Sequence, residues 1–231
     1  MADTGVLISI IMPVLHEAGI INDAIANLRG LRQNTPLEII VVDGDPAGST
    51  LQAIQDDDIV QLLSEPGRAL QMNRGAKQAK GEILLFLHAD TLLPQQALIR
   101  IEAALADARF VAGAFDLGFD TKRSIFRITE KYVALRTRLT SVPFGDQAIF
   151  VRKAYFETIG GYAELPLMED VELMRRIKKR GDRILLIPEK VMTSPRRYEQ
   201  EGILYCTFRN WALQVCYLAG VSPEKLVKWY R

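Results

Sequence analysis

The sequence is poor in cysteine and histidine, which excludes several kinds of site. Cys206 and Cys216 are too few for a disulfide framework. They lie ten positions apart in an apparent helix, about 15 Å along its axis, which is too far for a bond between them. This usage indicates a reducing compartment. With only His16 and His88 in the chain, a histidine-rich metal site is also excluded.

The chain has little net charge and no long uninterrupted apolar segment. Its formal net charge is +1, which gives no argument for an acidic partner, and we expect no nucleic-acid partner. The N-terminus lacks the features of a signal peptide. Residues 203–220 are apolar but interrupted by Arg209, Asn210 and Gln214, so they predict an amphipathic helix packed on the domain. A peripheral membrane contact or a dimer face is the alternative. We therefore expect a cytoplasmic protein, with contact at the inner membrane face left open.

Three common signatures are missing. No G-x-G-x-x-G follows the first apolar run, and there is neither a G-x-x-x-x-G-K-[ST] loop nor a G-x-S-x-G elbow. A dinucleotide enzyme, a P-loop nucleotidase and a hydrolase of the elbow type are therefore disfavoured.

What is present, with 48% hydrophobic and 25% charged residues, is an ordinary globular composition. In the first half, apolar runs alternate with helical patterns, as is typical of a parallel sheet covered on both faces. The runs lie at 6–12, 39–42, 59–63 and 83–87, and the helical patterns at 18–31, 50–55, 69–79 and 95–106. We predict an α/β fold with a Rossmann-like, mostly parallel sheet and helices on both faces.

The second half has no linker, repeat or low-complexity segment. We expect a strand at 111–119, a helix at 124–137, a strand and a short helix in "FGDQAIFVRKAYFETIGGY", a helix in "MEDVELMRRIKKRG", and short strands at 183–187 and near Val191. The prediction is one domain over residues 1–231 with an integral second half.

Polar residues follow the strands of the first half, where sheets of this class bind ligands. Asp43 could accept hydrogen bonds from a base or a ribose, or could simply form the Asp-Gly turn. In "FLHADTLLP", Asp90 is a suitable ligand for Mg²⁺ or Mn²⁺, and His88 could be a second ligand or a phosphate donor. The alternative is a turn-capping Asp90 and an ordinary strand-end histidine.

Other candidates occur on predicted helices. The acids of "MEDVE", with Asp170 at their centre, could supply a general base or could merely cap the helix. Arg68 could meet phosphate or base, or could belong to a polar helix face. Arg196 and Arg197 in "SPRRYEQEG" could clamp a diphosphate or could be surface charge.

Taken in order, these stretches resemble a family 2 glycosyltransferase with the GT-A fold. The resemblance covers most of the chain, through "ISIIMPVLHEAGIINDAIANL", "EIIVVDGDPAGST", "GRALQMNRGAKQAKGEILLFLHADT", "FGDQAIFVRKAYFETIGGY" and "MEDVELMRRIKKRG". The stretch "SPRRYEQEG" and the tail "NWALQVCYLAGVSPEKLVKWY" are similar to a small bacterial subgroup named for its association with radical-SAM and selenocysteine-type proteins.

The resemblance implies a nucleotide-binding half to about residue 90 and an acceptor-binding half from about 91 to 231. The nucleotide would contact Pro13, Val14, Glu17, Asp43, Arg68, His88 and Ala89. Asp90 would hold Mg²⁺ or Mn²⁺ on the diphosphate. Glu169 and Asp170 would be the catalytic acidic pair, with Asp170 as the general base. The sugar or acceptor side would comprise Gly145, Asp146, Gln147, Arg196 and Arg197.

Three departures from the family pattern stand out. His88 replaces the first acid of Asp-x-Asp, and "VVDGD" replaces the common Asp-Asp-Gly-Ser, so metal binding and base selection can differ. The Gln-x-x-Arg-Trp signature is absent, which argues against a processive polysaccharide synthase.

The resulting hypothesis is an inverting transfer of a sugar from a UDP- or GDP-sugar to a hydroxyl of a small or lipid-linked acceptor, by an enzyme that could be oligomeric. One alternative is a nucleotidyltransferase, although "PVLHEAG" has one glycine where such enzymes usually have a glycine-rich loop. Another is a catalytically inactive nucleotide-sugar-binding module, which the histidine at position 88 would favour. The sequence identifies neither the sugar nor the acceptor.

Overall fold

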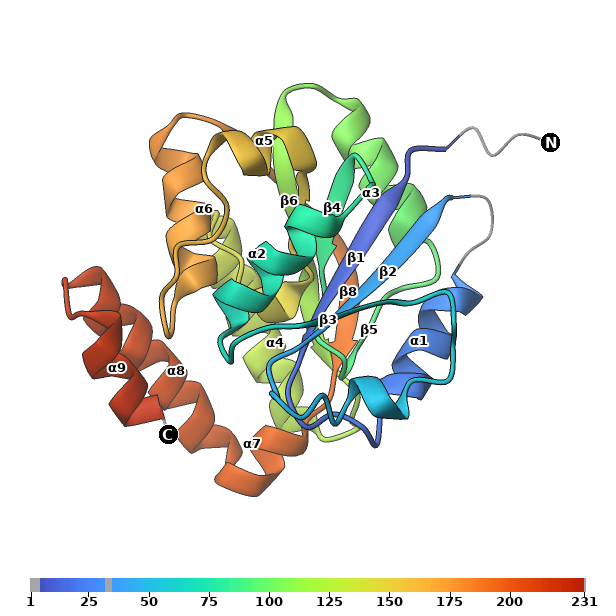
Figure 1. Cartoon of the computed structure of the whole chain (residues 1–231). Coiled ribbons are helices and arrows are strands. Elements are labelled where there is room, and N and C mark those ends of the chain that lie inside the picture. The colour runs from blue at the N-terminus through green and yellow to red at the C-terminus, as the bar shows by residue number, and fades with distance from the viewer. Residues whose placement is uncertain (1–4, 32–34, 231) are drawn as a thin grey trace.

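The computed structural model describes residues 5–31 and 35–230, and an eight-stranded sheet runs through them (Figure 1). Its strand order is β3-β2-β1-β4-β7-β6-β8-β5, and only β7 and β5 in this sheet run against the others. The strands are β1 (Ile8–Val14), β2 (Leu37–Asp43), β3 (Val60–Leu63), β4 (Ile83–Phe86), β5 (Thr91–Leu92), β6 (Phe110–Phe119), β7 (Phe150–Arg152) and β8 (Arg183–Thr193).

Helices cover both faces of the sheet, as the apolar strands predict. They are α1 (Ile21–Gly30), α2 (Arg68–Gln78), α3 (Ala97–Ala106), α4 (Ser124–Thr140), α5 (Lys153–Thr158), α6 (Glu169–Lys179), α7 (Arg196–Glu201), α8 (Ile203–Leu218) and α9 (Pro223–Tyr230), with 3₁₀ turns η1 (Leu51–Ala53) and η2 (Gly145–Gln147). No described helix is both long and apolar enough to cross a membrane.

The core has two layers because successive residues of a strand point to opposite faces. Ile10 of β1 packs in a cluster with α1 and α3, whereas Ile11 packs with α2, α5 and α6. Gly75 sets the distance between α2 and the sheet, since a Cβ atom there would lie 2.5 Å from Cγ2 of Ile11. This close packing fixes the first residue of α2, Arg68, at the carboxyl edge of the sheet.

The α/β class, the sheet and the main helices are confirmed, and two local predictions are wrong. Residues 50–55 contain only the 3₁₀ turn η1, so no α-helix forms there. The strands expected at 183–187 and near Val191 are one strand, β8, whose register with β6 shifts after Ile187. Pro188 lacks an N–H group and causes this break in the ladder without ending the strand.

Candidate active site

Two cavities open at the carboxyl edge of the sheet and meet at Arg68, His88 and Asp90. The β1 cavity, about 310 Å³, lies against the end of β1 and the start of α2. The α6 cavity, about 260 Å³, lies on the other side of these three residues and reaches the start of α6 and the helices α7 to α9. Parallel strands that end at one edge produce this convergence.

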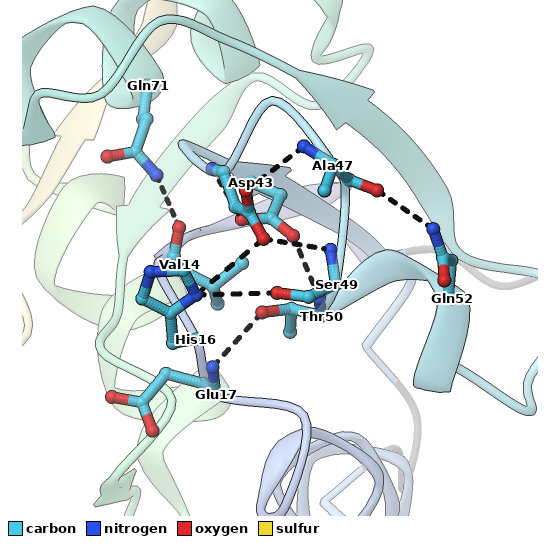
Figure 2. Close-up of polar contacts among 10 residues, drawn as sticks. Val14, His16, Glu17, Asp43, Ala47, Ser49, Thr50, Gln52 and Gln71 are labelled. Carbon is cyan, nitrogen blue, oxygen red and sulfur yellow. Dashed lines mark hydrogen bonds and ion pairs between the residues drawn. The ribbon is translucent and has the colours of Figure 1, made fainter.

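The β1 cavity collects most of the residues predicted to bind nucleotide. Its lining includes Pro13, Val14, Glu17, Arg68, His88 and Ala89. Gln71 of α2 links the helix to β1 and β2 at this cavity, because its Nε2 donates to the carbonyl oxygens of Val14 at 2.7 Å and Val42 at 2.8 Å. Figure 2 shows the contact with Val14.

Asp43 is fully buried and organises the loop that follows β2 (Figure 2). Its Oδ1 accepts from the backbone N–H of Asp45 and its Oδ2 from that of Thr50, each at 2.9 Å. The Thr50 hydroxyl in turn accepts from the N–H of Glu17 at 3.1 Å, which joins this loop to the loop after β1. The turn-forming interpretation therefore describes the local structure, and contact of Asp43 with a base stays a prediction.

Arg68 and Glu169 form an ion pair that links α2 to α6 across the site. The Nε of Arg68 lies 2.8 Å from Oε1 of Glu169, and Glu169 is buried. Burial raises the pKa of the Glu169 carboxyl, Arg68 opposes this rise, and neighbouring Asp170 adds to it. The Oε2 of Glu169 is buried without a hydrogen-bond partner within the described part of the chain. Glu169 is thus turned toward Arg68 at the junction of the cavities.

Asp170 lines the α6 cavity and is fixed by two backbone donors. Its Oδ2 accepts from the N–H of Gly145 at 2.6 Å and its Oδ1 from that of Val171 at 2.7 Å. A Cβ atom on Gly145 would lie 3.4 Å from both this Oδ2 and Nε2 of His88, so the three residues are close together. Met168, just before α6, has a φ of 67°, a conformation that non-glycine residues adopt at a cost.

Asp146 lies in the α6 cavity, and its pKa is displaced upward. Burial raises the pKa of Asp146 to about 6; Arg136 opposes this effect and the negative charge of Asp170 reinforces it. Its Oδ1 is buried and has no hydrogen-bond partner among the described residues. Such a carboxyl exchanges its proton near neutral pH.

The family follows from the sequence. The model of "Glycosyl transferase family 2" matches residues 9–160, which is more than half of the chain. The chain belongs to this family of glycosyltransferases. The matched region contains the whole β1 cavity and Asp146, and it ends before α6.

Solved structures show the same GT-A fold. A mannosyltransferase, PcManGT, from Pyrobaculum calidifontis, solved with GDP-Man and Mn²⁺, has a TM-score of 0.66 and 23% identity over 82% of this chain. TarS 1–349 from S. aureus has a TM-score of 0.58 and 18% identity over 95% of this chain and 68% of its own. Our chain spans 57% of the PcManGT structure. No curated protein sequence matches it.

In this glycosyltransferase, the two predicted clamp arginines lie in different places. Arg197 lines the α6 cavity, lies over the ring of Tyr230 at 4.1 Å, and pairs with Glu201 at 3.1 Å. Arg196 instead contacts Glu17 at 3.4 Å, which joins α7 to the loop after β1. The structure therefore does not bring the two guanidinium groups together on one ligand position.

Gln147 lies behind the cavity wall and does not line the α6 cavity. It is fully buried; its Nε2 donates to the carbonyl oxygen of Phe115 at 2.9 Å and its Oε1 accepts from Thr137 at 3.1 Å.

Two residues that were not predicted as site residues, Tyr198 of α7 and Asn210 of α8, line the α6 cavity. Nothing in their local pattern marks them, because only the packing of these helices brings them to the site.

Asp90 and His88 could supply two ligands to a metal ion whose other ligands come from the substrate. Asp90 stands at the junction of the cavities and His88 beside it, where burial and Arg68 lower the pKa of the imidazole and favour its neutral, ligating form. Within residues 5–31 and 35–230, no group of three or more potential side-chain ligands converges as a metal site. Mg²⁺ and Mn²⁺ accept few protein carboxylates and complete their shells with phosphate and water. Asp90 and His88 are therefore suited to such an ion.

Proposed function

We propose that this glycosyltransferase moves a sugar, with inversion, from a nucleoside-diphosphate sugar to a hydroxyl acceptor. The observation that carries the proposal is the meeting of the β1 and α6 cavities at Arg68, His88 and Asp90. Nucleotide in the first cavity and acceptor in the second would leave the anomeric carbon between them, close to these three residues.

In the proposed reaction, the acceptor oxygen bonds to the anomeric carbon as the bond from that carbon to the diphosphate oxygen breaks. Asp170 takes the proton of the acceptor hydroxyl, and the leaving diphosphate keeps the electron pair. The two backbone N–H groups that hold Asp170 support this role, because they fix the orientation of its carboxylate. Asp146 is another carboxylate of the same cavity, and it would adjust the charge around Asp170.

Asp90, with His88 as its neighbour, would hold Mg²⁺ or Mn²⁺, an ion that offsets the charge of a leaving diphosphate. The Arg68 guanidinium would act on the same charge directly, from the first turn of α2. Support for a divalent ion and a nucleotide-sugar donor comes from PcManGT, whose structure contains GDP-Man and Mn²⁺.

Further features of the proposal come from the sequence. We place the nucleotide-binding half at about residues 1–90 and the acceptor-binding half at 91–231. We assign the chain to the bacterial radical-SAM-associated subgroup, with a UDP- or GDP-sugar as donor, a small or lipid-linked acceptor and a cytoplasmic location. Oligomer formation is compatible with each of these assignments.

A donor screen tests the proposal. The purified chain is incubated with UDP- and GDP-sugars, with Mn²⁺ or with a chelator, and release of the nucleoside diphosphate is measured. Metal-dependent release from one donor, and an inverted anomeric centre in the product by NMR, would support it. Diphosphate release from a nucleoside triphosphate and a sugar phosphate would instead identify a nucleotidyltransferase. Metal-dependent binding without turnover of any donor would identify an inactive binding module.

A further inference from the structure

Helix α4 carries a second apolar stripe on its outer side. It buries Phe126 in the core together with the polar Thr129, Glu130 and Thr137, whereas Ile128, Leu135 and Leu139 are 66%, 59% and 76% exposed. A helix that faces water on one side normally exposes polar residues there. On α4 that side carries large apolar residues.

Helix α8 also exposes an apolar stripe. Its buried residues are Cys206, Leu213 and Gln214, while the exposed large apolar residues fall at the spacing of one helical face: Leu204, Phe208, Trp211, Val215 and Leu218. The sequence predicts that this helix packs its apolar face on the domain, and for most of these side chains that prediction is wrong. Leu213 packs against the core, and the larger stripe does not.

The two stripes adjoin. Tyr132 of α4 and Trp211 of α8 are both partly exposed members of their stripes, and both line one narrow cavity of about 40 Å³ between the helices. The two stripes therefore meet at Tyr132 and Trp211, and we call them together the α4–α8 face, defined by Ile128, Leu135, Leu139, Leu204, Phe208 and Trp211. Large apolar side chains grouped at the surface in this way mark an interaction site.

The charges that α4 and α8 themselves present at the surface are positive. The charged residues of the two helices are basic apart from Glu130, which is buried and paired with Arg127 and Lys190. Lys131 is exposed, and Arg127 and Arg138 are 40% and 45% exposed although each pairs with a buried acid. Arg209 is mostly buried and pairs with Glu201 of α7. Long basic side chains beside apolar residues suit an anionic surface.

We propose that the α4–α8 face lies on the surface of an anionic lipid bilayer. Leucine and phenylalanine side chains would enter the boundary between headgroups and acyl chains, and Tyr132 and Trp211 would lie at headgroup level. A symmetric dimer through the same face is disfavoured, since an isologous contact would place the exposed Lys131 of each copy against a face that also carries positive charge.

Bilayer contact would also orient the site. The cavity between α4 and α8 shares Phe144, Asp146, Tyr198 and Asn210 with the α6 cavity, where we place the acceptor. A lipid-linked acceptor could then approach from the membrane side. This last step rests on the proposed function, whereas bilayer binding itself does not.

Intrinsic fluorescence tests the contact directly, because the chain has only two tryptophans, Trp211 and Trp229. In the Trp229→Phe variant, Trp211 is the only tryptophan probe. We expect its emission to shift to shorter wavelength with vesicles of phosphatidylcholine and phosphatidylglycerol, and to be quenched when the lipids carry brominated acyl chains. With phosphatidylcholine alone the shift should be much weaker. An unchanged Trp211 emission with anionic vesicles would overturn the proposal.

Paired substitutions test the surface. The double variant Leu135→Gln, Phe208→Gln should bind anionic vesicles about tenfold or more weakly in a flotation assay. Ile99→Gln is the matched control, since Ile99 is 49% exposed on α3, well away from α8 in Figure 1. Circular dichroism and thermal unfolding establish that each variant folds. Equal vesicle binding by the double variant and the control would contradict the proposal.

Two more measurements distinguish membrane binding from dimer formation and from the proposed transfer activity. Analytical ultracentrifugation without lipid would reveal a concentration-dependent dimer; a dimer abolished by the same double substitution would assign the face to a second copy instead. Asp170→Asn should bind vesicles as the unaltered chain does. Vesicle binding with no transfer in any donor assay would refute the proposed function alone, and transfer without vesicle binding would refute the membrane contact alone.

Discussion

The region around β1 and the α4–α8 face both carry large apolar residues, but the first buries them and the second exposes them. All seven residues of β1 are buried, with apolar side chains divided between both layers of the core. On α8, a comparable density of apolar residues is largely exposed. The comparison teaches that periodicity reveals an apolar face but does not reveal what covers it. If this comparison holds, substitutions near β1 and at its junction with α6 change the chemistry, whereas substitutions on the α4–α8 face change attachment to a surface.

The largest expected effect is on transfer by Asp170→Asn. An amide accepts no proton at neutral pH, so the rate should fall by about a thousandfold, within the usual range for loss of a general base. The measurement is nucleoside diphosphate release with saturating donor and acceptor. Glu172→Gln is the control, because Glu172 lies on the same helix and pairs with Arg176 at 2.7 Å. Comparable losses in both variants would point to disruption of α6 instead.

Glu169→Gln should weaken the link between the two sides of the site. The pair with Arg68 is buried on the glutamate side, but the Arg68 side chain is 39% exposed, so the cost should be about 1–2 kcal/mol of unfolding free energy. Urea denaturation measures this loss. Glu189→Gln removes the exposed pair with Arg100 and should change stability by less than about 0.5 kcal/mol. If the two variants lose the same amount of unfolding free energy, the Arg68–Glu169 pair stabilises the fold no more than an exposed ion pair does.

His88→Asp introduces the acid that the family resemblance predicts at that position. A second carboxylate beside Asp90 should lower the Mn²⁺ concentration required for half-maximal transfer by about tenfold. Titration of Mn²⁺ against the transfer rate measures this change. An unaltered Mn²⁺ requirement would show that position 88 does not face the ion.

The smallest expected effect concerns Asp146 and pH. Its folded-state pKa, about 6, lies above the usual value of 3.8, so the folded state binds more protons between these values. Its contribution to stability is therefore fully present below pH 3.8 and is lost as the pH rises through about 6. Asp146→Asn should raise the Tm at pH 8 by a few degrees relative to the unaltered chain, and by less at pH 5. Differential scanning calorimetry at both pH values tests this, and an equal shift at each pH would contradict it.

Much of the β1 region was predictable because it depends on local patterns. Apolar β-branched runs identified β1, β2 and β4, and parallel pairing then placed Val14, His88 and Asp90 at one edge. Asp43 lies at the end of β2 as the sequence predicts, its contact with a nucleotide stays a prediction, and its hydrogen bonds depend on the backbone path of residues 44–50. The motif located the residue, and only the fold showed what its oxygens contact.

The region near α6 and α8 was less predictable because its properties depend on burial. The raised pKa of Asp146 results from the packing of distant segments, and no spacing in the sequence encodes it. The pairing of Glu169 with Arg68 joins residues a hundred positions apart. The pattern predicted separate short strands at 183–187 and near Val191, although β8 passes through an irregularity beside β6 and continues. In each case a contact between distant segments decided the outcome.

Calorimetry combined with a transfer assay tests the central claim most directly, that Asp90 serves the donor and Asp170 the acceptor. The donor nucleoside diphosphate and Mn²⁺ are titrated into the unaltered chain, Asp90→Asn and Asp170→Asn, and transfer is measured on the same samples. We predict that Asp90→Asn loses Mn²⁺-dependent binding, whereas Asp170→Asn binds normally and transfers nothing. An Asp170→Asn variant that keeps most of its turnover, or an Asp90→Asn variant that binds normally, would contradict the account.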